Sequence, residues 1–199
     1  TVIYNGVNTN FYHPNLEIKY KKGSPQLLFV SVLRKYKKTS DLIYAMPKLL
    51  KKYPQAHLQI VGNGKDFDRL KKIIQEKNLE KSIEMTGRID DDELRLRYAS
   101  CDVYVSASTN EHCPVPTFEA MACGKPLVLS KLESHTEILD DSKAGLTFSF
   151  SDNDDLCEKI DKVFQDKINY GKNAIKFASK HDLEKFCKRV EKVYDDILS

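Results

Sequence analysis

Residues 27–61 of the chain read LLFVSVLRKYKKTSDLIYAMPKLLKKYPQAHLQIV, and the fold can be inferred outward from this stretch. Its two ends, residues 27–33 and 57–61, are short and almost wholly apolar, which is typical of strands covered on both faces of a sheet. Between them, residues 40–53 carry apolar side chains at helical spacing, interrupted by Pro47. The stretch therefore predicts two parallel strands joined by a right-handed helical crossover.

The same alternation of strand and helix patterns continues along the chain. Strands are predicted at residues 82–85, 103–106 and 127–130, and helices at residues 65–77, 91–99 and 116–123. After Asp152 the apolar spacing is helical throughout, with one helix around residues 156–164 and one or two more over residues 174–199. We predict an α/β fold, a Rossmann-like doubly wound parallel sheet with a C-terminal helical tail. Ligands of such sheets bind outside the carboxyl ends of the strands, so the loops at that edge matter most.

Composition excludes several classes of function. The net charge of +3 on 199 residues is too small to argue for nucleic-acid binding. Five cysteines without a C-x-x-C pair argue against a disulfide framework or a zinc site, and they fit a reducing, cytoplasmic compartment. No apolar stretch approaches the ~20 residues that a membrane-spanning helix needs. The chain opens without a signal peptide. A strand-like pattern already begins at Val2-Ile3, and from this abrupt start we expect the chain to be a fragment of a longer protein.

The most informative loop lies in residues 110–128, NEHCPVPTFEAMACGKPLV. It follows a predicted buried strand and enters a helix near Pro116. The stretch contains three prolines, the last of which precedes the next predicted strand. The unpaired N–H groups and positive dipole end of that helix would suit a diphosphate. Glu119, one turn further on, suits sugar hydroxyls because a carboxylate accepts two hydrogen bonds from a diol. A purely structural interpretation fits the residues equally well. In it Glu119 is only a favourable carboxylate near the helix N-terminus, and Gly124 is only the C-cap of the helix.

The whole chain resembles a known family. Glu111 and Glu119 form an E-x7-E pair, and with AMACGKP at 120–126 they resemble the signature of retaining GT-B glycosyltransferases of family 4, the glycosyl transferases group 1. Further landmarks resemble that family in the same order: VIYNGVN at 2–8, FVSVLRKYK at 29–37, IVGNG at 60–64, TGRI at 86–89 and YASCDV at 98–103.

The resemblance implies a reaction and a division of the chain. The reaction is transfer of a glycosyl unit from a nucleoside-diphosphate sugar, UDP- or GDP-linked, to an acceptor hydroxyl with retention of configuration. Residues 1–14 would form an interdomain crossover, 15–171 a nucleotide-sugar-binding domain, and 172–199 a helix packing toward an N-terminal acceptor domain of the same polypeptide. No nucleic-acid partner is implied. Lipids are among the acceptors of the family, so peripheral membrane association through that other domain stays open. We expect the present chain to be inactive alone.

The resemblance also assigns roles to residues. Glu119 would hold the ribose, Arg88 and Ile89 would lie along the nucleobase, and Glu111 would face the donor sugar. Lys37, with Lys38 as the alternative register, would neutralise the diphosphate leaving group. We expect no metal and no cofactor, since residues 110–117 contain no Asp-x-Asp pair that could hold Mg²⁺. The expected catalytic residues are Glu111 and Lys37, and the expected donor-binding residues are Glu119, Arg34, Lys38, Arg88, Ile89, His112, Cys113, Pro114, Val115, Pro116 and Thr117.

One departure from the family pattern leaves other functions open. Val32 stands where the family has an arginine, and a valine cannot neutralise phosphate. Arg34 lies two residues on, so in an extended segment its side chain would point to the same side and replace that arginine. If it does not, the chain is better explained as a non-catalytic sugar-nucleotide-binding module. A sugar-nucleotide epimerase of the same fold is the other alternative.

Overall fold

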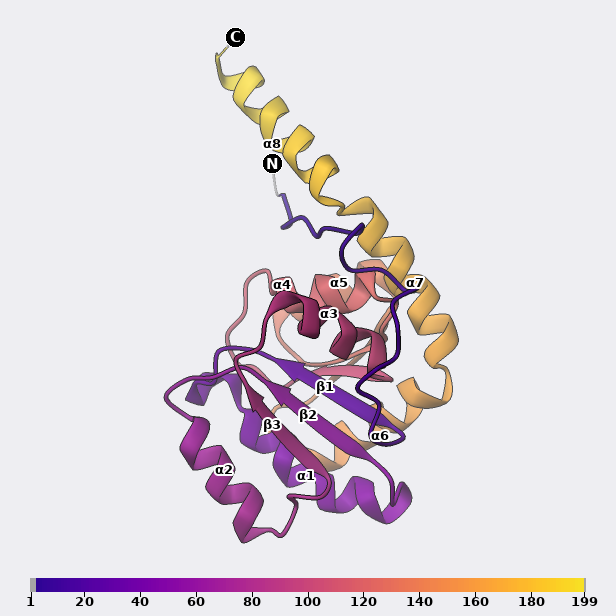
Figure 1. The fold of residues 1–199 in the computed structure, drawn as a ribbon. Coiled ribbons are helices and arrows are strands. Elements are labelled where there is room, and N and C mark those ends of the chain that lie inside the picture. Colours follow the sequence, from indigo (N-terminus) through magenta and orange to yellow (C-terminus); the bar gives the residue numbers. More distant parts are fainter. Residues whose placement is uncertain (1–2, 199) are drawn as a thin grey trace.

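The computed structural model describes residues 3–198 and contains one six-stranded parallel sheet with helices on both faces (Figure 1). The strand order is β3-β2-β1-β4-β5-β6, and every neighbouring pair is parallel. This is the predicted α/β, Rossmann-like fold. The strands are β1 (Gln26–Val30), β2 (His57–Val61), β3 (Ile83–Gly87), β4 (Val103–Ser106), β5 (Leu127–Ser130) and β6 (Gly145–Phe148).

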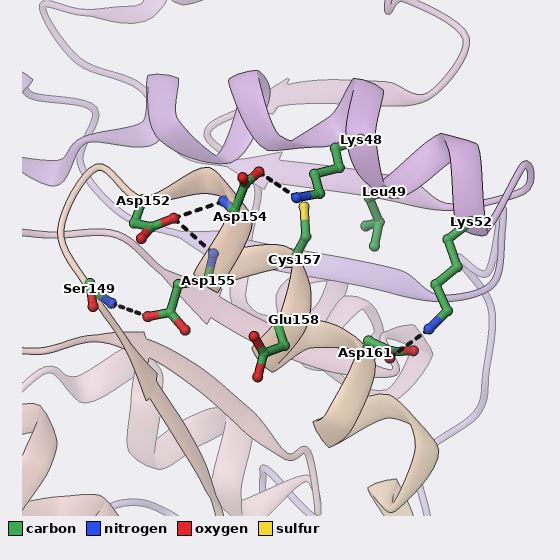
Figure 2. A pocket seen from close by; sticks show the side chains of 10 residues that line it. All are labelled: Lys48, Leu49, Lys52, Ser149, Asp152, Asp154, Asp155, Cys157, Glu158 and Asp161. Atoms are coloured by element: carbon green, nitrogen blue, oxygen red, sulfur yellow. Dashed lines mark hydrogen bonds and ion pairs between the residues drawn. The ribbon is translucent and has the colours of Figure 1, made fainter.

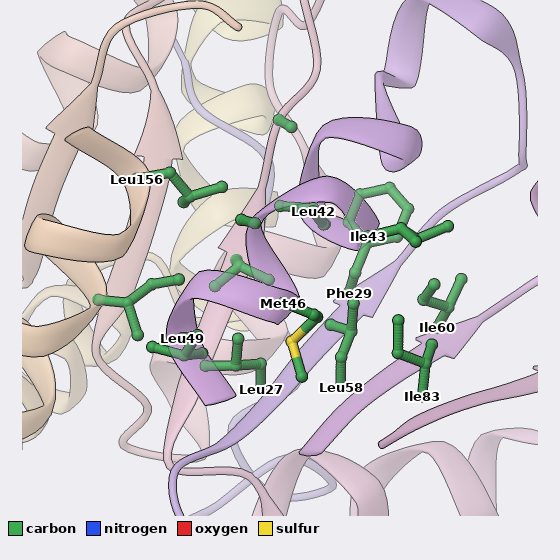
Figure 3. Close-up of a cluster of buried hydrophobic side chains, with 14 of the residues drawn as sticks. Leu27, Phe29, Leu42, Ile43, Met46, Leu49, Leu58, Ile60, Ile83 and Leu156 are labelled. Carbon is green, nitrogen blue, oxygen red and sulfur yellow. The ribbon is translucent and has the colours of Figure 1, made fainter. Parts of the chain in front are cut away.

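Each face of the sheet has its own hydrophobic core. Alternate residues of one strand point to opposite faces, so Leu27 and Phe29 of β1 lie in one core and Leu28 lies in the other. The first core packs under α1 (Thr39–Lys52), α2 (Phe67–Glu76) and α6 (Asn153–Gln165), and Figure 3 shows part of it. The second core packs under α3 (Asp91–Ser100), α4 (Val115–Ala122), α5 (Glu133–Ser142) and α7 (Lys167–Lys180). Burial on both faces explains why the strands are almost wholly apolar.

The predicted elements agree with the structure to within three residues except in the places that follow. α7 begins at Lys167, seven residues before the predicted helical stretch that starts at residue 174. Ile3 lies in no strand, and Val2 of the strand-like pair lies outside the described residues. The strand predicted over residues 27–33 ends at Val30, because Ser31 makes the last hydrogen bond to β2, at Val61, and Leu33 already pairs with Asn63 in the turn after β2. β6 and α5 were not predicted. β6 is a four-residue strand that begins with a glycine, and α5 begins without a side-chain cap, so neither has a strong local signal. Pro47 lies inside α1, which continues through it.

The last helix, α8 (Leu183–Leu198), extends away from the sheet (Figure 1). None of its residues is buried, and Tyr194, Ile197 and Leu198 are 64%, 73% and 83% exposed. Its first turn is tied to the N-terminal segment by Val7, whose N–H donates to His181 O at 2.9 Å and whose carbonyl accepts from Leu183 N at 3.0 Å. Within residues 3–198, no helix combines the length and the apolar character that crossing a membrane would require.

A buried carboxylate ties three segments together at the amino ends of the strands. Asp102, 7% exposed, accepts hydrogen bonds from Lys21 Nζ at 2.5 Å, Gln26 N at 2.8 Å and Lys167 Nζ at 2.7 Å. Burial alone would raise the pKa of Asp102, but these three donors outweigh it and lower the pKa. The carboxylate is therefore committed to holding β4, α7 and the segment before β1 in place.

We predict that Asp102→Asn lowers the free energy of unfolding at pH 7 by about 1.5–3 kcal/mol, the range for hydrogen bonds to charged groups. The folded-state pKa of Asp102 lies below its unfolded value, so its contribution is present above the unfolded pKa of about 3.9 and is lost as the pH falls through the folded pKa. The difference between the two proteins should therefore shrink below about pH 4. Urea unfolding of both proteins at several pH values measures this difference in the free energy of unfolding.

Asp154→Asn is the matched control, because Asp154 pairs with Lys48 at 2.5 Å but is 79% exposed. It should cost less than about 1 kcal/mol. Equal losses for the two variants would contradict the role given to Asp102.

Candidate functional site

The order of the strands places one crevice at the carboxyl edge of the sheet. The chain moves outward from β1 to β2 and β3, and then returns to the other side of β1 with β4. The loops that follow β1 and β4 therefore leave the sheet in opposite directions and flank a gap, which is where ligands of such sheets bind. Thr109 joins the two loops, because its N–H and its hydroxyl both donate to Tyr36 O, at 2.8 and 3.0 Å.

The two expected catalytic residues meet in this crevice. Lys37 is the last residue of the short helix η1 (Lys35–Lys37) after β1, and Glu111 lies in the loop after β4. Lys37 Nζ forms an ion pair with Glu111 Oε1, and the two side chains are only 13% and 15% exposed. A partly desolvated pair of this kind is stronger than a surface ion pair, and its charges are available to a ligand that can exchange with them.

The end of β2 and the turn that follows it hold the loop after β1 in position. Ser31 N donates to Val61 O at 3.1 Å, and Leu33 N donates to Asn63 O at 2.9 Å. A Cβ atom at Gly62 would lie 1.9 Å from Ser31 O. One at Gly64 would lie 2.2 Å from Leu33 O. Only glycine allows such a close approach of two main chains, so the GNG turn sets where the basic loop begins.

The basic loop places Arg34 on the same side as Val32. Val32 is 57% exposed and Arg34 is exposed, whereas Leu33 between them is fully buried. This alternation is what an extended segment produces, and Arg34 has extended backbone angles. Neither Arg34 nor Lys38 has an ion-pair partner within residues 3–198. Both therefore remain available to an anion at the crevice.

The loop before α4 is anchored from two sides. Asn5 of the N-terminal segment donates from Nδ2 to Cys113 O at 3.1 Å and from its main chain to Cys113 Sγ at 3.3 Å. On the other side, Ser134 Oγ donates to Glu111 O at 2.8 Å. The helix α4 begins at Val115 with no side-chain hydrogen bond capping its N-terminus. Of the other expected residues here, His112 and Val115 are exposed, Pro114 and Pro116 are partly exposed, and Thr117 is buried.

A cavity of about 400 Å³ opens beside Glu111. It is bounded by the loop after β4 and by the start of α5, where Glu133, Ser134 and Glu137 lie. Tyr4 donates a hydrogen bond from its hydroxyl to Glu137. These α5 residues were not among the expected site residues, because no helix is predicted there, although apolar Ile138 and Leu139 in HTEIL offer a weak helical signal. The lining residues are Thr109, Asn110, Glu111, His112, Leu132, Glu133, Ser134 and Glu137.

Glu119 belongs to a second group of contacts, between α3 and α4. Its Oε2 accepts a hydrogen bond of 2.8 Å from the hydroxyl of Tyr98, which is fully buried. Burial is the largest influence on Glu119 and raises its pKa. Ile89 packs partly buried against the same core, and Arg88 beside it is exposed. No hydrogen bond or ion pair within residues 3–198 links this group directly to the Lys37–Glu111 pair.

A larger cavity, of about 630 Å³, lies between α1 and α6 on the other face of the sheet (Figure 2). It contains none of the expected site residues. Its charges are satisfied locally: Lys52 pairs with Asp161 at 2.6 Å, and Asp152 caps α6 through the N–H groups of Asp154 and Asp155. Among the described residues, no group of three His, Cys, Asp or Glu side chains could hold a metal ion. The metal independence of the site stays a prediction.

Comparison with known proteins places the whole fold in one family. The family model described as "Glycosyl transferases group 1" matches residues 15–181. An uncharacterised glycosyltransferase of Methanocaldococcus jannaschii is 30% identical over 98% of this chain, which covers 53% of that protein. The chain thus spans about half the length of such relatives.

Two solved structures illustrate the likeness in fold. The C-terminal domain of a glycosyl transferase group 1 family protein from Francisella tularensis is 25% identical, with a TM-score of 0.77 over 88% of this chain and 97% of that one. The HepE protein of Anabaena, solved in complex with UDP and glucose, is 23% identical and has a TM-score of 0.84 over 98% of this chain and 57% of its own.

One residue of the basic loop, Lys38, has a strained backbone conformation that affects stability. Lys38 has φ 49° and ψ 31°, the left-handed region that favours glycine. We predict that Lys38→Gly raises the free energy of unfolding by about 0.5–1 kcal/mol, because relief of the left-handed strain exceeds the added freedom of the unfolded chain. Urea unfolding tests this. Lys71→Gly, at an exposed position inside α2, is the control and should lower stability by about 1 kcal/mol. A loss of stability in both variants would contradict the prediction.

Proposed function

The chain belongs to the glycosyl transferases group 1 family, and we propose that it is the donor-binding half of a GT-B glycosyltransferase. In this proposal it binds a nucleoside-diphosphate sugar, UDP- or GDP-linked, for transfer to an acceptor hydroxyl with retention of configuration. The observation that carries the proposal is the shielded Lys37–Glu111 pair at the point where the strand order reverses. That is the place where a doubly wound sheet binds nucleotides.

The charges at the crevice suit a diphosphate leaving group. In the proposed reaction, negative charge develops on the diphosphate as the bond to the sugar breaks, and fixed positive groups stabilise it. Lys37, Arg34 and Lys38 supply such groups, and the uncapped N-terminus of α4 supplies N–H donors and a favourable dipole. When the diphosphate binds Lys37, it competes with Glu111 for the same ammonium group. Glu111 is then released to accept hydrogen bonds from the hydroxyls of the donor sugar.

The nucleoside would lie on the α3 side of the crevice. Glu119 would accept hydrogen bonds from the ribose hydroxyls, with Arg88 and Ile89 beside the base. The loop from His112 to Thr117 would surround the sugar and diphosphate, mainly through its main chain. No metal ion or cofactor is needed in this arrangement, because the basic residues and N–H groups meet the negative charge.

The acceptor site would belong to an N-terminal domain of the same polypeptide. Two features support this division: the chain spans about half of its relatives, and α8 has no buried residue, with Tyr194, Ile197 and Leu198 largely exposed. The crossover between the domains would be the expected segment 1–14, of which residues 3–14 are described. The expected helix over 172–199 is two helices: residues 172–180 belong to α7, which packs on the second core of this chain, so only α8 would pack on the other domain. Peripheral membrane association would then depend on that domain and its acceptor.

We predict that this chain binds UDP, GDP or ADP weakly and catalyses no transfer. Glu119→Ala should weaken binding of the preferred nucleotide by about 1.5–3 kcal/mol, because a hydrogen bond to a charged group is lost, and should leave the fold intact. Calorimetry with each nucleotide, with and without EDTA, measures both effects. Binding should be the same in EDTA.

The 2′,3′-dideoxyribose form of the preferred nucleotide is the control ligand. Its affinity should be equal for the wild-type chain and Glu119→Ala. If Glu119→Ala weakens both ligands alike, Glu119 does not bind the ribose. If no nucleotide binds at all, the donor-site proposal fails.

We also predict that Arg34 and Lys37 bind the diphosphate jointly. Each single change to Ala should weaken binding of the nucleoside diphosphate, by about 1.5–3 kcal/mol for a charged hydrogen bond. The double variant should lose less than the sum of the two, because both residues contact one group. Calorimetry on the four proteins gives the coupling energy, and Lys35→Ala, an exposed neighbour in η1, is the control.

One outcome would favour the second candidate function. If Lys37→Ala weakens binding while Arg34→Ala changes nothing, the arginine that Val32 replaces has no substitute in this chain. The exposed Val32 would then favour a sugar-nucleotide-binding module without transferase activity.

A further inference from the structure

Tyr98 occupies a special place beside the candidate nucleoside site. It lies near the end of α3, is fully buried, and donates its hydroxyl to Glu119 Oε2 at 2.8 Å. Tyr12 packs edge-on against its ring, with the centroids 5.8 Å apart and the planes at 85°, and Tyr104 lies on another side at 6.2 Å. The ring is therefore packed from two directions, and this packing directs its hydroxyl at Glu119.

The same contact commits only part of the Glu119 carboxylate. Besides Tyr98, the only side chain within residues 3–198 that acts on it as a hydrogen-bond donor is Tyr12, and Glu119 as a whole is partly exposed. A carboxylate with one oxygen held by a buried donor has its second oxygen in a defined direction. That direction suits a ligand with hydrogen-bond donors, and a ribose diol donates where a phosphate cannot.

The hydroxyl of Tyr98 also influences the charge of Glu119. Burial raises the pKa of Glu119, while the hydroxyls of Tyr98 and Tyr12 act in the opposite direction, and the nearby Asp91 raises the pKa further. No lysine or arginine is among the groups that shift it. The hydroxyls therefore favour the charged form of Glu119 and only partly offset burial, and they leave the carboxylate without a salt-bridge partner that a ligand would have to displace.

We propose that Tyr98 is a positioning residue, which holds Glu119 Oε2 so that Oε1 is preset to accept the 2′- and 3′-hydroxyls of the donor nucleotide. This inference rests on the proposed function, since it requires that a ribose binds at Glu119. It adds that discrimination for the ribose hydroxyls depends on a residue that does not touch the ligand.

A purely structural role predicts different behaviour. As a core residue, Tyr98 would affect every ligand equally through the stability of α3 and α4. As a positioning residue, it affects only ligands that carry the ribose hydroxyls. Comparing UDP with 2′,3′-dideoxy-UDP separates the two roles, because the two probes share the base and the diphosphate.

The test is calorimetry of both probes with Tyr98→Phe, which keeps the ring and removes the hydroxyl. UDP should bind about fivefold more weakly, the equivalent of one hydrogen bond, while dideoxy-UDP binds as to the wild-type chain. Removal of the hydroxyl raises the pKa of Glu119 further, so a larger share of the carboxyl is protonated at a given pH. The deficit for UDP should accordingly be larger at pH 6 than at pH 8.

Tyr104→Phe is the matched control. Tyr104 is a second buried tyrosine of the same cluster, and its hydroxyl makes no hydrogen bond to Glu119. It should leave the ratio of the two affinities unchanged. Equal weakening of UDP and dideoxy-UDP by Tyr98→Phe, or no effect on either, would overturn the inference.

Glu119→Gln tests the same contact if Tyr98→Phe is too unstable for calorimetry. The Tyr98 hydroxyl has no other acceptor within residues 3–198, so it must bind the amide carbonyl and turn the amide N–H₂ toward the ribose. Preference for UDP should then fall about fivefold, because a neutral N–H₂ donor meets the ribose hydroxyls in place of a charged acceptor. A Glu119→Gln protein with the full wild-type preference overturns the inference. A wild-type chain that binds neither probe, or binds both equally, refutes the proposed ribose site itself, which separates that failure from a failure of Tyr98.

Discussion

The parallel pairing of β1 with β4 is the contact on which the rest of the site depends. The register sets Leu27 opposite Val103 and Leu28 opposite Tyr104, although the two strands are far apart in the chain. All four side chains are buried, on alternate faces, and burying a large apolar side chain contributes about 1.5–3 kcal/mol. The pairing is therefore held by both cores at once. Because the strands are parallel, their carboxyl ends emerge together, and the loops that carry Lys37 and Glu111 meet.

Three acidic residues in this domain illustrate how environment separates structure from function. Asp102 accepts hydrogen bonds from two lysines and a main-chain N–H, which lower its pKa. Both of its carboxylate oxygens are therefore already engaged within the fold. Burial raises the pKa of Glu119, the hydroxyls of Tyr98 and Tyr12 only partly offset this, and no cation pairs with the carboxylate within residues 3–198. Glu111 lies between these extremes, paired with one lysine at the edge of a cavity. Only the last two retain hydrogen-bonding capacity for a ligand.

The agreement between sequence and structure is best where a pattern is local. β2, β4 and β5 have the predicted bounds because each is a short apolar run between polar turns. The end of β1 was misplaced, since Leu33 is apolar for a different reason: it is buried by the GNG turn and not by a strand neighbour. α5 went unpredicted, and with it the wall of the cavity formed by Ser134 and Glu137.

The sequence by itself determined the fold class, the alternation of strands and helices, and the residues that resemble a family signature, because each is written in local spacing. Only the tertiary structure decided which of those residues meet. It pairs Lys37 with Glu111, sets Arg34 on the side of Val32, and joins Glu119 to Tyr98, a partner with no local signal. The physical reason is that local propensity acts over a few residues, whereas burial and hydrogen bonding at the crevice join segments that only the order of the strands brings together.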